Sequence, residues 1–122
     1  MERKRATSIL GRLGEEGAAA LLCAEGWTIV ARNFRAGRGE IDIVAERGDS
    51  LAFVEVKAWT KNGPAELIRS LSNGKARRII ETSKIFLSKY RQYNGKRIRY
   101  DVVFLSSCGE PRRYEGAFDD SL

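Results

Sequence analysis

The stretch 39-GEIDIVAERGDSLAFVEVK-57 decides the fold, because two segments rich in β-formers flank a tight-turn signal. Gly48-Asp49 suits a short β-hairpin loop, and residues 41–46 and 51–58 are typical of the two strands. The same stretch carries three carboxylates (Glu40, Asp42 and Glu55) and Lys57 at alternate positions of its two halves. A hairpin that builds a core must therefore also accommodate a group of charges.

The predicted turn fixes which charges meet across the hairpin. With Gly48-Asp49 as the loop, Asp42 faces Glu55 and Glu40 faces Lys57. Side chains alternate between the two faces of a strand, so these four residues share one face with Phe53. The apolar set takes the opposite face: Ile41, Ile43, Val54 and Val56. Core packing and charge clustering thus favour the same register.

The facing carboxylates of Asp42 and Glu55 predict a cation site. Directly opposed Cβ atoms lie about 4.5–5.5 Å apart, and two carboxylates at that separation repel one another. A hard divalent cation with oxygen ligands relieves the repulsion, and Mg²⁺ (or Mn²⁺) fits this chemistry. Such an ion activates water and stabilises charge on a phosphoryl group. Lys57 would hold a phosphate or the attacking water, or stabilise the transition state.

A simpler interpretation of the same charges is a solvated sheet face with alternating signs. Lys57 would then only pair with Glu40 or Glu55, and no metal would bind. Glu40 itself has three open roles: a partner of Lys57, an additional ligand, or neither.

The composition indicates one globular α/β domain over residues 1–122, of which residues 1–10 are expected to be flexible. The hydrophobic fraction of 43% and the charged fraction of 31% are ordinary for such a domain. No apolar run approaches the ~20 residues that cross a bilayer. The basic N-terminal residues precede no apolar segment with a cleavage site, so we expect a cytoplasmic protein without membrane association.

The chain contains no histidine, which excludes several classes of enzyme. Ser-His-Asp and Cys-His catalysis, histidine-metal nucleases and the usual zinc enzymes all need that side chain. Cys23 and Cys108 are too few for a disulfide framework or a zinc site. Cys23 lies in an Ala/Leu-rich segment, where we expect a buried thiol.

The net charge of +6 is unevenly distributed along the chain. Residues 61–99 carry eleven Lys/Arg and two acids, whereas residues 100–122 carry two basic and five acidic residues. A basic stripe of this kind favours binding of a polyanion, with nucleic acid the leading candidate. The alternative is a merely charged helix surface, which is common.

The remaining sequence predicts a mixed sheet flanked by helices, in the order α-β-β-β-α-β with a further short strand. Residues 14–25 form a helix that ends at Gly26, and residues 27–32 form the first strand. A basic glycine-containing loop is expected over residues 34–39. A short helix can start at Pro64, and residues 76–90 have the periodicity of an amphipathic helix. Strands are predicted over 99–105 and near 113–115.

The acidic and lysine motifs resemble the core of the PD-(D/E)xK nuclease superfamily. More closely, the chain resembles the YraN-like family of predicted bacterial endonucleases, which is related to archaeal Holliday junction resolvases. The similarity runs from about Gly11 to Phe118, and the ordered set of motifs is more specific than any one of them. The matching segments are Gly14-Glu15, Gly26-Trp27, Arg32-Asn33-Phe34-Arg35, Gly39-Glu40-Ile41-Asp42, Phe53-Val54-Glu55-Val56-Lys57, Lys75-Ala76-Arg77-Arg78-Ile79, Arg99-Tyr100-Asp101-Val102-Val103 and Ala117-Phe118.

This resemblance implies a restriction-endonuclease-like αβββαβ core and a specific site. Asp42 and Glu55 would be metal ligands, with the Val56 carbonyl as a third, and Lys57 would be the catalytic lysine. Glu15 matches an additional acidic residue of resolvase-like members. Glu16 is the alternative to Glu15, and a favourable position at the helix N-terminus is another role for Glu15.

The sequence departs from the family pattern at Trp59, where an arginine is usual. Trp59 would either stack on a base, weaken the DNA contact, or anchor a core or a dimer.

Two functions follow as hypotheses. The first is a Mg²⁺-dependent endonuclease that hydrolyses phosphodiester bonds in structured or branched DNA, with a homodimer as the arrangement that would suit symmetric cutting. The second is a nucleic-acid-binding module with the nuclease fold but little catalysis, acting with a DNA-processing partner. A purely structural protein leaves the carboxylates and the basic stripe unexplained. Phosphate contacts are expected from the basic residues Arg35, Arg38, Lys61, Lys75, Arg77 and Arg78.

Overall fold

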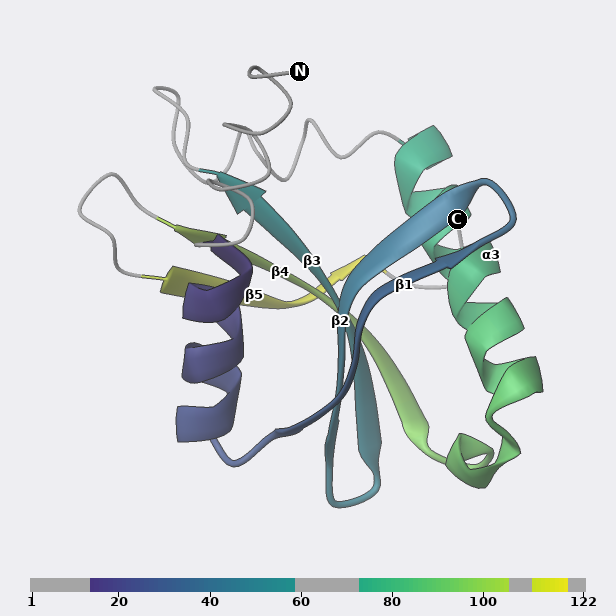
Figure 1. The fold of residues 1–122 in the computed structure, drawn as a ribbon, viewed down its shortest axis with the longest axis horizontal. Helices are drawn as coiled ribbons and strands as arrows, with labels where there is room; N and C mark the ends of the chain where they lie inside the picture. The colour runs from purple at the N-terminus through teal and green to yellow at the C-terminus, as the bar shows by residue number, and fades with distance from the viewer. Residues whose placement is uncertain (1–13, 59–72, 106–110, 119–122) are drawn as a thin grey trace.

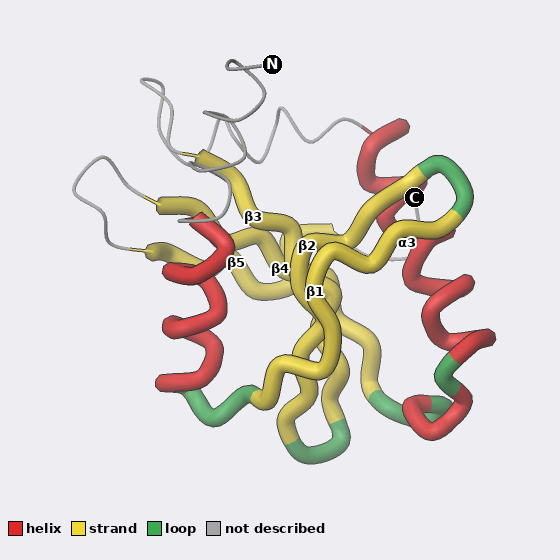
Figure 2. The backbone as a smooth tube through the Cα atoms, in the orientation of Figure 1, coloured by secondary structure: helices red, strands yellow, loops and turns green. Residues whose placement is uncertain are grey.

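The computed structural model describes residues 14–58, 73–105 and 111–118 (Figures 1 and 2). Within these ranges a five-stranded sheet lies between two helices, one at each side. Residues 14–24 form the N-terminal helix. The other elements are β1 (Thr28–Ala36), β2 (Gly39–Arg47), β3 (Ser50–Ala58), α3 (Asn73–Lys89), a 3₁₀ turn (Arg91–Tyr93), β4 (Arg97–Leu105) and β5 (Pro111–Phe118).

The sheet has the strand order β1-β2-β3-β4-β5. Only β3 and β4 pair in parallel, and the other three pairs are antiparallel. Parallel neighbours need a crossover connection, and α3 lies on the chain between β3 and β4. The predicted mixed sheet and restriction-endonuclease-like αβββαβ order are thus confirmed, with β5 as the additional strand.

The N-terminal helix ends in a Schellman motif at Gly26. Gly26 has φ +91°, and its N–H donates to the Cys23 carbonyl at 3.0 Å. The Trp27 N–H donates to the Leu22 carbonyl at 2.9 Å, which satisfies a second terminal carbonyl. Leu22 is buried, whereas Cys23 is exposed, so the prediction of a buried thiol was wrong. The residue after an inward-facing leucine turns out of the packed stripe of a helix.

Each face of the sheet carries its own hydrophobic core, because one helix covers each face (Figure 1). The N-terminal helix packs on Ile43 and Val54, among others. On the other face, α3 packs on Val44 and Phe53. The predicted division of this hairpin into an apolar and a charged face was therefore wrong for its central part, where Phe53 is 1% exposed. A strand covered on both faces is apolar at successive positions rather than alternating.

Helix α3 forms as its periodicity predicts, with an apolar face on the sheet. Ala76, Ile79 and Ile80 are at most 4% exposed. Phe86 contacts the rings of Phe34 and Phe53, with centroids 5.1 and 5.7 Å away. These contacts fix the helix against β1 and β3.

Strand β1 is longer than the sequence indicated. It continues to Ala36 and pairs with β2 down to Ala36–Gly39, so residues 34–36 are strand where a loop was predicted. The connection shrinks to a two-residue turn at Gly37-Arg38, where Gly37 has φ +60°. Backbone pairing with β2 outweighs the polar, glycine-containing composition of this segment. The predicted short helix at Pro64, Trp59 and Cys108 all lie outside the described residues.

No helix in the described ranges has both the length and the apolar content that a membrane crossing requires.

Gly39 marks the closest approach between β2 and α3. A Cβ atom built at this position would lie 2.2 Å from Thr82 Oγ1 and 3.0 Å from the Arg78 carbonyl oxygen. The Thr82 hydroxyl is itself held by a 2.7 Å hydrogen bond to that carbonyl. The start of β2 is therefore positioned directly against the backbone of α3.

We expect Gly39→Ala to destabilise the protein by about 1–3 kcal/mol, because the added methyl group forces β2 and α3 apart. Urea denaturation measures the loss. Thr82→Ala removes one of the two clashing atoms. Gly39→Ala should therefore cost less stability in the Thr82→Ala background than in wild type. A Gly39→Ala variant as stable as wild type would contradict this close approach.

Candidate functional site

The hairpin strands separate just where the charged residues begin. The β2–β3 ladder runs from Arg47–Ser50 to Ile43–Val54, in the predicted register, and ends there. Beyond this point β2 continues toward α3 while β3 runs away from it (Figure 1). The two predicted facing pairs, Asp42–Glu55 and Glu40–Lys57, therefore lie beyond the ladder.

Asp42 links β2 to β3 where the two strands separate. Its Oδ2 atom accepts a 2.7 Å hydrogen bond from the Val56 N–H. A β3 backbone donor that has lost its strand partner is thus satisfied by a carboxylate instead. The same bond ties Asp42 to the segment that carries Glu55, Val56 and Lys57.

Burial, followed by the nearby charge of Glu55, raises the pKa of Asp42 to about 7 from 3.8. The hydrogen bond from Val56 opposes this rise, whereas the charges of Glu15 and Glu40 add to it. A cation beside Asp42 would offset this concentration of negative charge. The structure thus brings Asp42 within electrostatic reach of three other acidic residues.

Two lysines meet at Glu55, which is buried at 9% exposure. Lys57 Nζ lies 3.4 Å and Lys75 Nζ lies 3.3 Å from Glu55 Oε1. Burial, followed by hydrogen bonding with Lys75, lowers the pKa of Lys57. Burial also acts to lower the pKa of Lys75, but hydrogen bonding with Lys57 and the charge of Glu55 outweigh it and raise that pKa.

The contact between Lys75 and Glu55 was missed by sequence reasoning, which assigned Lys75 only to phosphate contacts. Lys75 lies in the first turn of α3, and helical periodicity gives no information about which strand that turn will meet. The contact depends on how α3 packs on the sheet.

Glu15 and Glu16 point to different partners. Glu15 Oε2 accepts a 3.2 Å hydrogen bond from Asn33 Nδ2, and its charge acts on Asp42. Glu16 forms a 2.6 Å ion pair with Arg32. Of the two alternatives, Glu15 is the residue that the structure brings toward Asp42.

Glu40 pairs with β1 rather than with Lys57. Its carboxylate lies 3.4 Å from Arg35 Nε, and the two residues are also backbone neighbours in the β1–β2 ladder. The predicted partnership of Glu40 with Lys57 is replaced because Lys57 contacts Glu55, two residues away on the same strand.

The predicted phosphate-binding residues fall on two neighbouring elements. Arg35 and Arg38 lie at the tip of the β1–β2 hairpin, with side chains 78% and 79% exposed. Arg38 also reaches across to Glu81 on α3, at 3.6 Å. Arg77 and Arg78 are exposed on the first half of α3, and Lys61 lies outside the described residues.

The oxygen donors of Asp42 and Glu55 fit a hard cation such as Mg²⁺ or Mn²⁺. In the described part of the chain, no group of three or more His, Cys, Asp or Glu side chains forms a metal-binding cluster. The predicted third ligand, the Val56 carbonyl, belongs to the residue whose N–H is bound to Asp42. The predicted donors are therefore two carboxylates and the carbonyl of the residue that follows Glu55.

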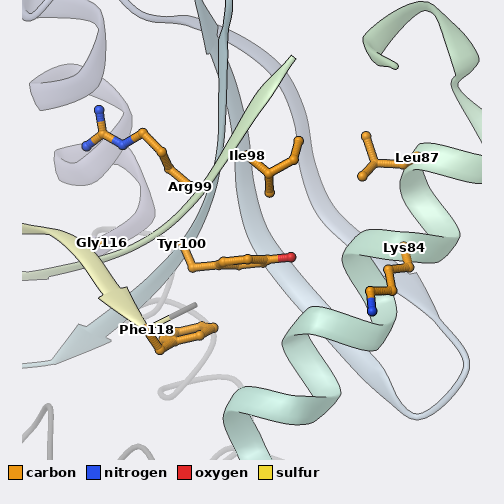
Figure 3. Close-up of a pocket in the computed structure, with 7 residues that line it drawn as sticks. All are labelled: Lys84, Leu87, Ile98, Arg99, Tyr100, Gly116 and Phe118. Carbon is orange, nitrogen blue, oxygen red and sulfur yellow. The ribbon is translucent and has the colours of Figure 1, made fainter. Parts of the chain in front are cut away.

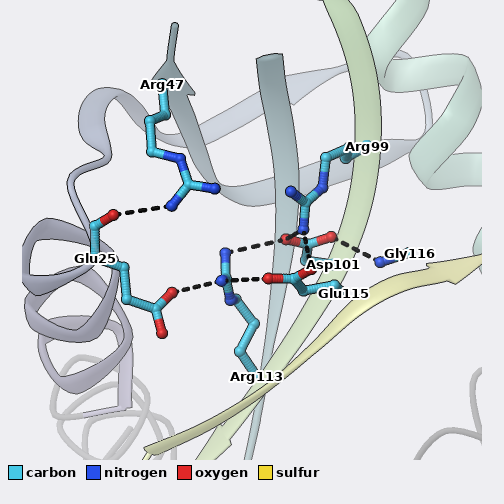
Figure 4. Close-up of polar contacts among 7 residues, drawn as sticks. All are labelled: Glu25, Arg47, Arg99, Asp101, Arg113, Glu115 and Gly116. Carbon is cyan, nitrogen blue, oxygen red and sulfur yellow. Dashed lines mark hydrogen bonds and ion pairs between the residues drawn. The ribbon is translucent and has the colours of Figure 1, made fainter.

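A second charged cluster links the N-terminal helix to β4 and β5 (Figure 4). Asp101 is fully buried and accepts a 2.9 Å hydrogen bond from the Gly116 N–H. Arg99 and Arg113 lie 3.2 and 3.6 Å from its Oδ2 atom. Burial raises the pKa of Asp101 although these partners oppose the rise. Its charges are satisfied within the fold, which is typical of a structural role.

A cavity of about 470 Å³ lies between α3 and the β4–β5 edge, and neither Asp42 nor Glu55 lines it (Figure 3). Its floor is the Tyr100 ring, stacked on Phe118 with centroids 5.1 Å apart. The Arg99 side chain points away from this cavity, toward the N-terminal helix. The lining residues are Lys84, Leu87, Ile98, Arg99, Tyr100, Gly116 and Phe118. None of these lining residues is acidic, so the cavity offers no carboxylate for a metal ion.

The fold and the site together define a mixed α/β protein with a restriction-endonuclease-like core and a carboxylate–lysine cluster where two central strands separate. The chain belongs to the uncharacterised protein family UPF0102, whose sequence model matches residues 14–105. The sequence resemblance is thus confirmed at the level of this family.

Two relatives are named for the family alone. A UPF0102 protein of Treponema pallidum (strain Nichols) is 42% identical over 99 residues, which cover 81% of this chain and 79% of the relative. One from Azorhizobium caulinodans is 38% identical over 117 residues, covering 96% and 88%. A structure of Pyrococcus furiosus SfsA in complex with Ca²⁺ is 19% identical, with a TM-score of 0.33 over 89% of this chain and 63% of that one. A likeness of that size supports no conclusion about function.

We expect Asp42→Asn to change the pH dependence of stability measured in a chelator. Between pH 3.8 and about 7 the folded state holds the Asp42 proton and the unfolded chain releases it, so wild type loses unfolding free energy as pH rises. The variant lacks this loss and keeps an acceptor for the Val56 N–H. At about pH 8 its free energy of unfolding should exceed that of wild type by on the order of 1–3 kcal/mol.

Urea denaturation at about pH 5 and about pH 8 measures this difference, with Asp49→Asn in the exposed hairpin turn as a matched control. Parallel pH profiles for wild type and Asp42→Asn would rule out the raised pKa.

The buried cluster yields a prediction about stability alone. Asp101→Ala removes the fully buried carboxylate that faces Arg99 and Arg113 and should cost about 3–5 kcal/mol, because the two arginines lose their buried counter-charge and the Gly116 N–H loses its acceptor. Glu115→Ala is the control, since Glu115 is 55% exposed and contacts the same arginines. That control should cost less than about 1 kcal/mol. Equal losses for the two variants, measured by thermal or urea denaturation, would contradict the assignment.

Proposed function

We propose that this protein is a metal-dependent endonuclease of the PD-(D/E)xK type that hydrolyses phosphodiester bonds in structured or branched DNA. The observation that carries the proposal is the convergence of Asp42, Glu55 and Lys57 where β2 and β3 separate. Two carboxylates and an ammonium group lie together there, bound through the Asp42–Val56 hydrogen bond and the Lys57–Glu55 ion pair. This combination suits phosphoryl chemistry without histidine.

Asp42 and Glu55, with the Val56 carbonyl, would hold Mg²⁺ or Mn²⁺. When bound, such an ion activates water and neutralises charge on the phosphoryl oxygens. The chain's own residues then have distinct tasks. Asp42 fixes the position of Val56, and Lys57 supplies a positive charge for the phosphate in the transition state. Glu15 adds negative charge beside Asp42 and is the candidate for an additional carboxylate of the site.

Basic residues next to the site support a nucleic-acid substrate. Two exposed pairs of arginines lie on neighbouring elements: Arg35 and Arg38 on the β1–β2 hairpin, and Arg77 and Arg78 on α3. Because Arg38 contacts Glu81, the hairpin tip and α3 lie close enough for one polyanion to meet both. Such side chains neutralise phosphates and release counterions, which gives affinity without sequence preference. Lys61 extends this set on the basis of sequence.

The proposal is tested with four-way junction, flap, linear duplex and single-stranded DNA in Mg²⁺, in Mn²⁺ and in chelator. Wild type should cleave a branched substrate only with metal. Asp42→Asn should lower the rate ~10²-fold or more, because it removes a ligand charge. Asp49→Asn, the same chemical change in the hairpin turn, should cleave as wild type does.

Equal cleavage by wild type and Asp42→Asn would mean that a contaminant cuts the DNA and would overturn the mechanism. Metal-independent binding of DNA without cleavage of any substrate would contradict an enzymatic function and favour a nucleic-acid-binding module.

A further inference from the structure

Glu55 has one ammonium partner more than its charge requires. Lys57 is placed beside Glu55 by the strand itself, because side chains two residues apart share a face. Lys75 comes from α3, and its Nζ lies at 3.3 Å from the same Oε1 atom that Lys57 approaches at 3.4 Å. Two cationic groups that meet at one oxygen repel each other, and a further negative charge nearby relieves that repulsion.

Asp42 supplies such a charge when it is ionised. Its carboxylate acts electrostatically on Lys75 as well as on Glu55. With Asp42 ionised and both lysines protonated, the two ammonium groups balance the two carboxylates. Lys75 thus provides, from outside the hairpin, positive charge that a divalent cation would otherwise supply.

The position of Lys75 is set by packing. The next residue, Ala76, is 2% exposed on the apolar face of α3, which fixes the backbone from which Lys75 extends. The Lys75 side chain itself is 34% exposed. A lysine with this exposure can move its ammonium group away from Glu55 without any rearrangement of the core.

We propose that Lys75 is a counter-cation of the carboxylate pair that competes with a divalent metal ion for Asp42 and Glu55 and is released to a substrate phosphate when metal binds. This inference rests on the metal site of the proposed function. Metal binding costs the Lys75–Glu55 contact, so Lys75 weakens metal affinity in the absence of DNA. The released ammonium group then contributes to phosphate binding, which makes metal and DNA binding cooperative.

The test of competition is Mn²⁺ titration of the full-length protein without DNA, followed by isothermal calorimetry and by the EPR signal of free Mn²⁺. Lys75→Met should bind Mn²⁺ about three- to tenfold more tightly than wild type, because a repelling charge is removed. Lys75→Gln should behave in the same way, and Lys75→Arg should restore the weaker wild-type affinity. Lys89→Met, at the far end of α3, is the matched control and should bind as wild type does.

Mn²⁺ affinity of Lys75→Met and Lys75→Gln equal to or weaker than that of wild type would overturn the competition. Failure of wild type and both variants to bind Mn²⁺ would overturn the metal site together with this inference. The predicted order of affinities in a protein that cleaves no DNA would support the inference while overturning the proposed nuclease.

The test of release is binding of a fluorescent four-way junction with Ca²⁺ or with chelator. Lys75→Met should lower affinity for the junction mainly in Ca²⁺, where the wild-type ammonium is free of Glu55. An equal loss of affinity in both conditions would overturn the release step.

Discussion

The hydrogen bond from the Val56 N–H to the Asp42 carboxylate is the constraint on which the site depends. Strands β2 and β3 must separate after Ile43–Val54, because β2 continues along β1 and α3 while β3 pairs with β4. Separation leaves the partly buried Val56 N–H without a strand partner, and an unpaired donor of this kind is costly. The carboxylate that satisfies it is thereby held next to Glu55, at the expense of its own ionisation.

The central hairpin could be predicted from sequence because its signals are local. The turn at Gly48-Asp49 fixes the register, and both appear in the structure as expected. The α3 periodicity and the glycine at the end of the N-terminal helix are local signals of the same kind. What the alternation of charges could not reveal is where the ladder would end. That point depends on the competition between β1, α3 and β3 for β2, which no single segment encodes.

The same distinction explains the candidate site. Asp42, Glu55 and Lys57 could be grouped from the sequence because they lie on adjoining strands. Lys75 could not be assigned to Glu55, since the path over residues 59–72 and the docking of α3 decide where its first turn lies. Similarly, only the packed structure distinguishes Glu15, near Asp42, from Glu16, paired with Arg32. Residues grouped by one hairpin could be predicted, whereas contacts that depend on packing between distant elements could not.

The cluster around Trp27 has a consequence for the order in which contacts form during synthesis of the chain. The guanidinium groups of Arg47, Arg99 and Arg113 lie 4.6, 5.3 and 5.7 Å from its ring centroid, and Arg113 also forms an ion pair with Glu25 at 2.5 Å. The first described helix is thus anchored by the last described strand. On a ribosome, where the N-terminal part emerges first, these anchoring contacts form only after β5 has been synthesised. The helix that carries Glu15 packs on β2 and β3 but gains its contacts with Arg113 only once β5 has been synthesised.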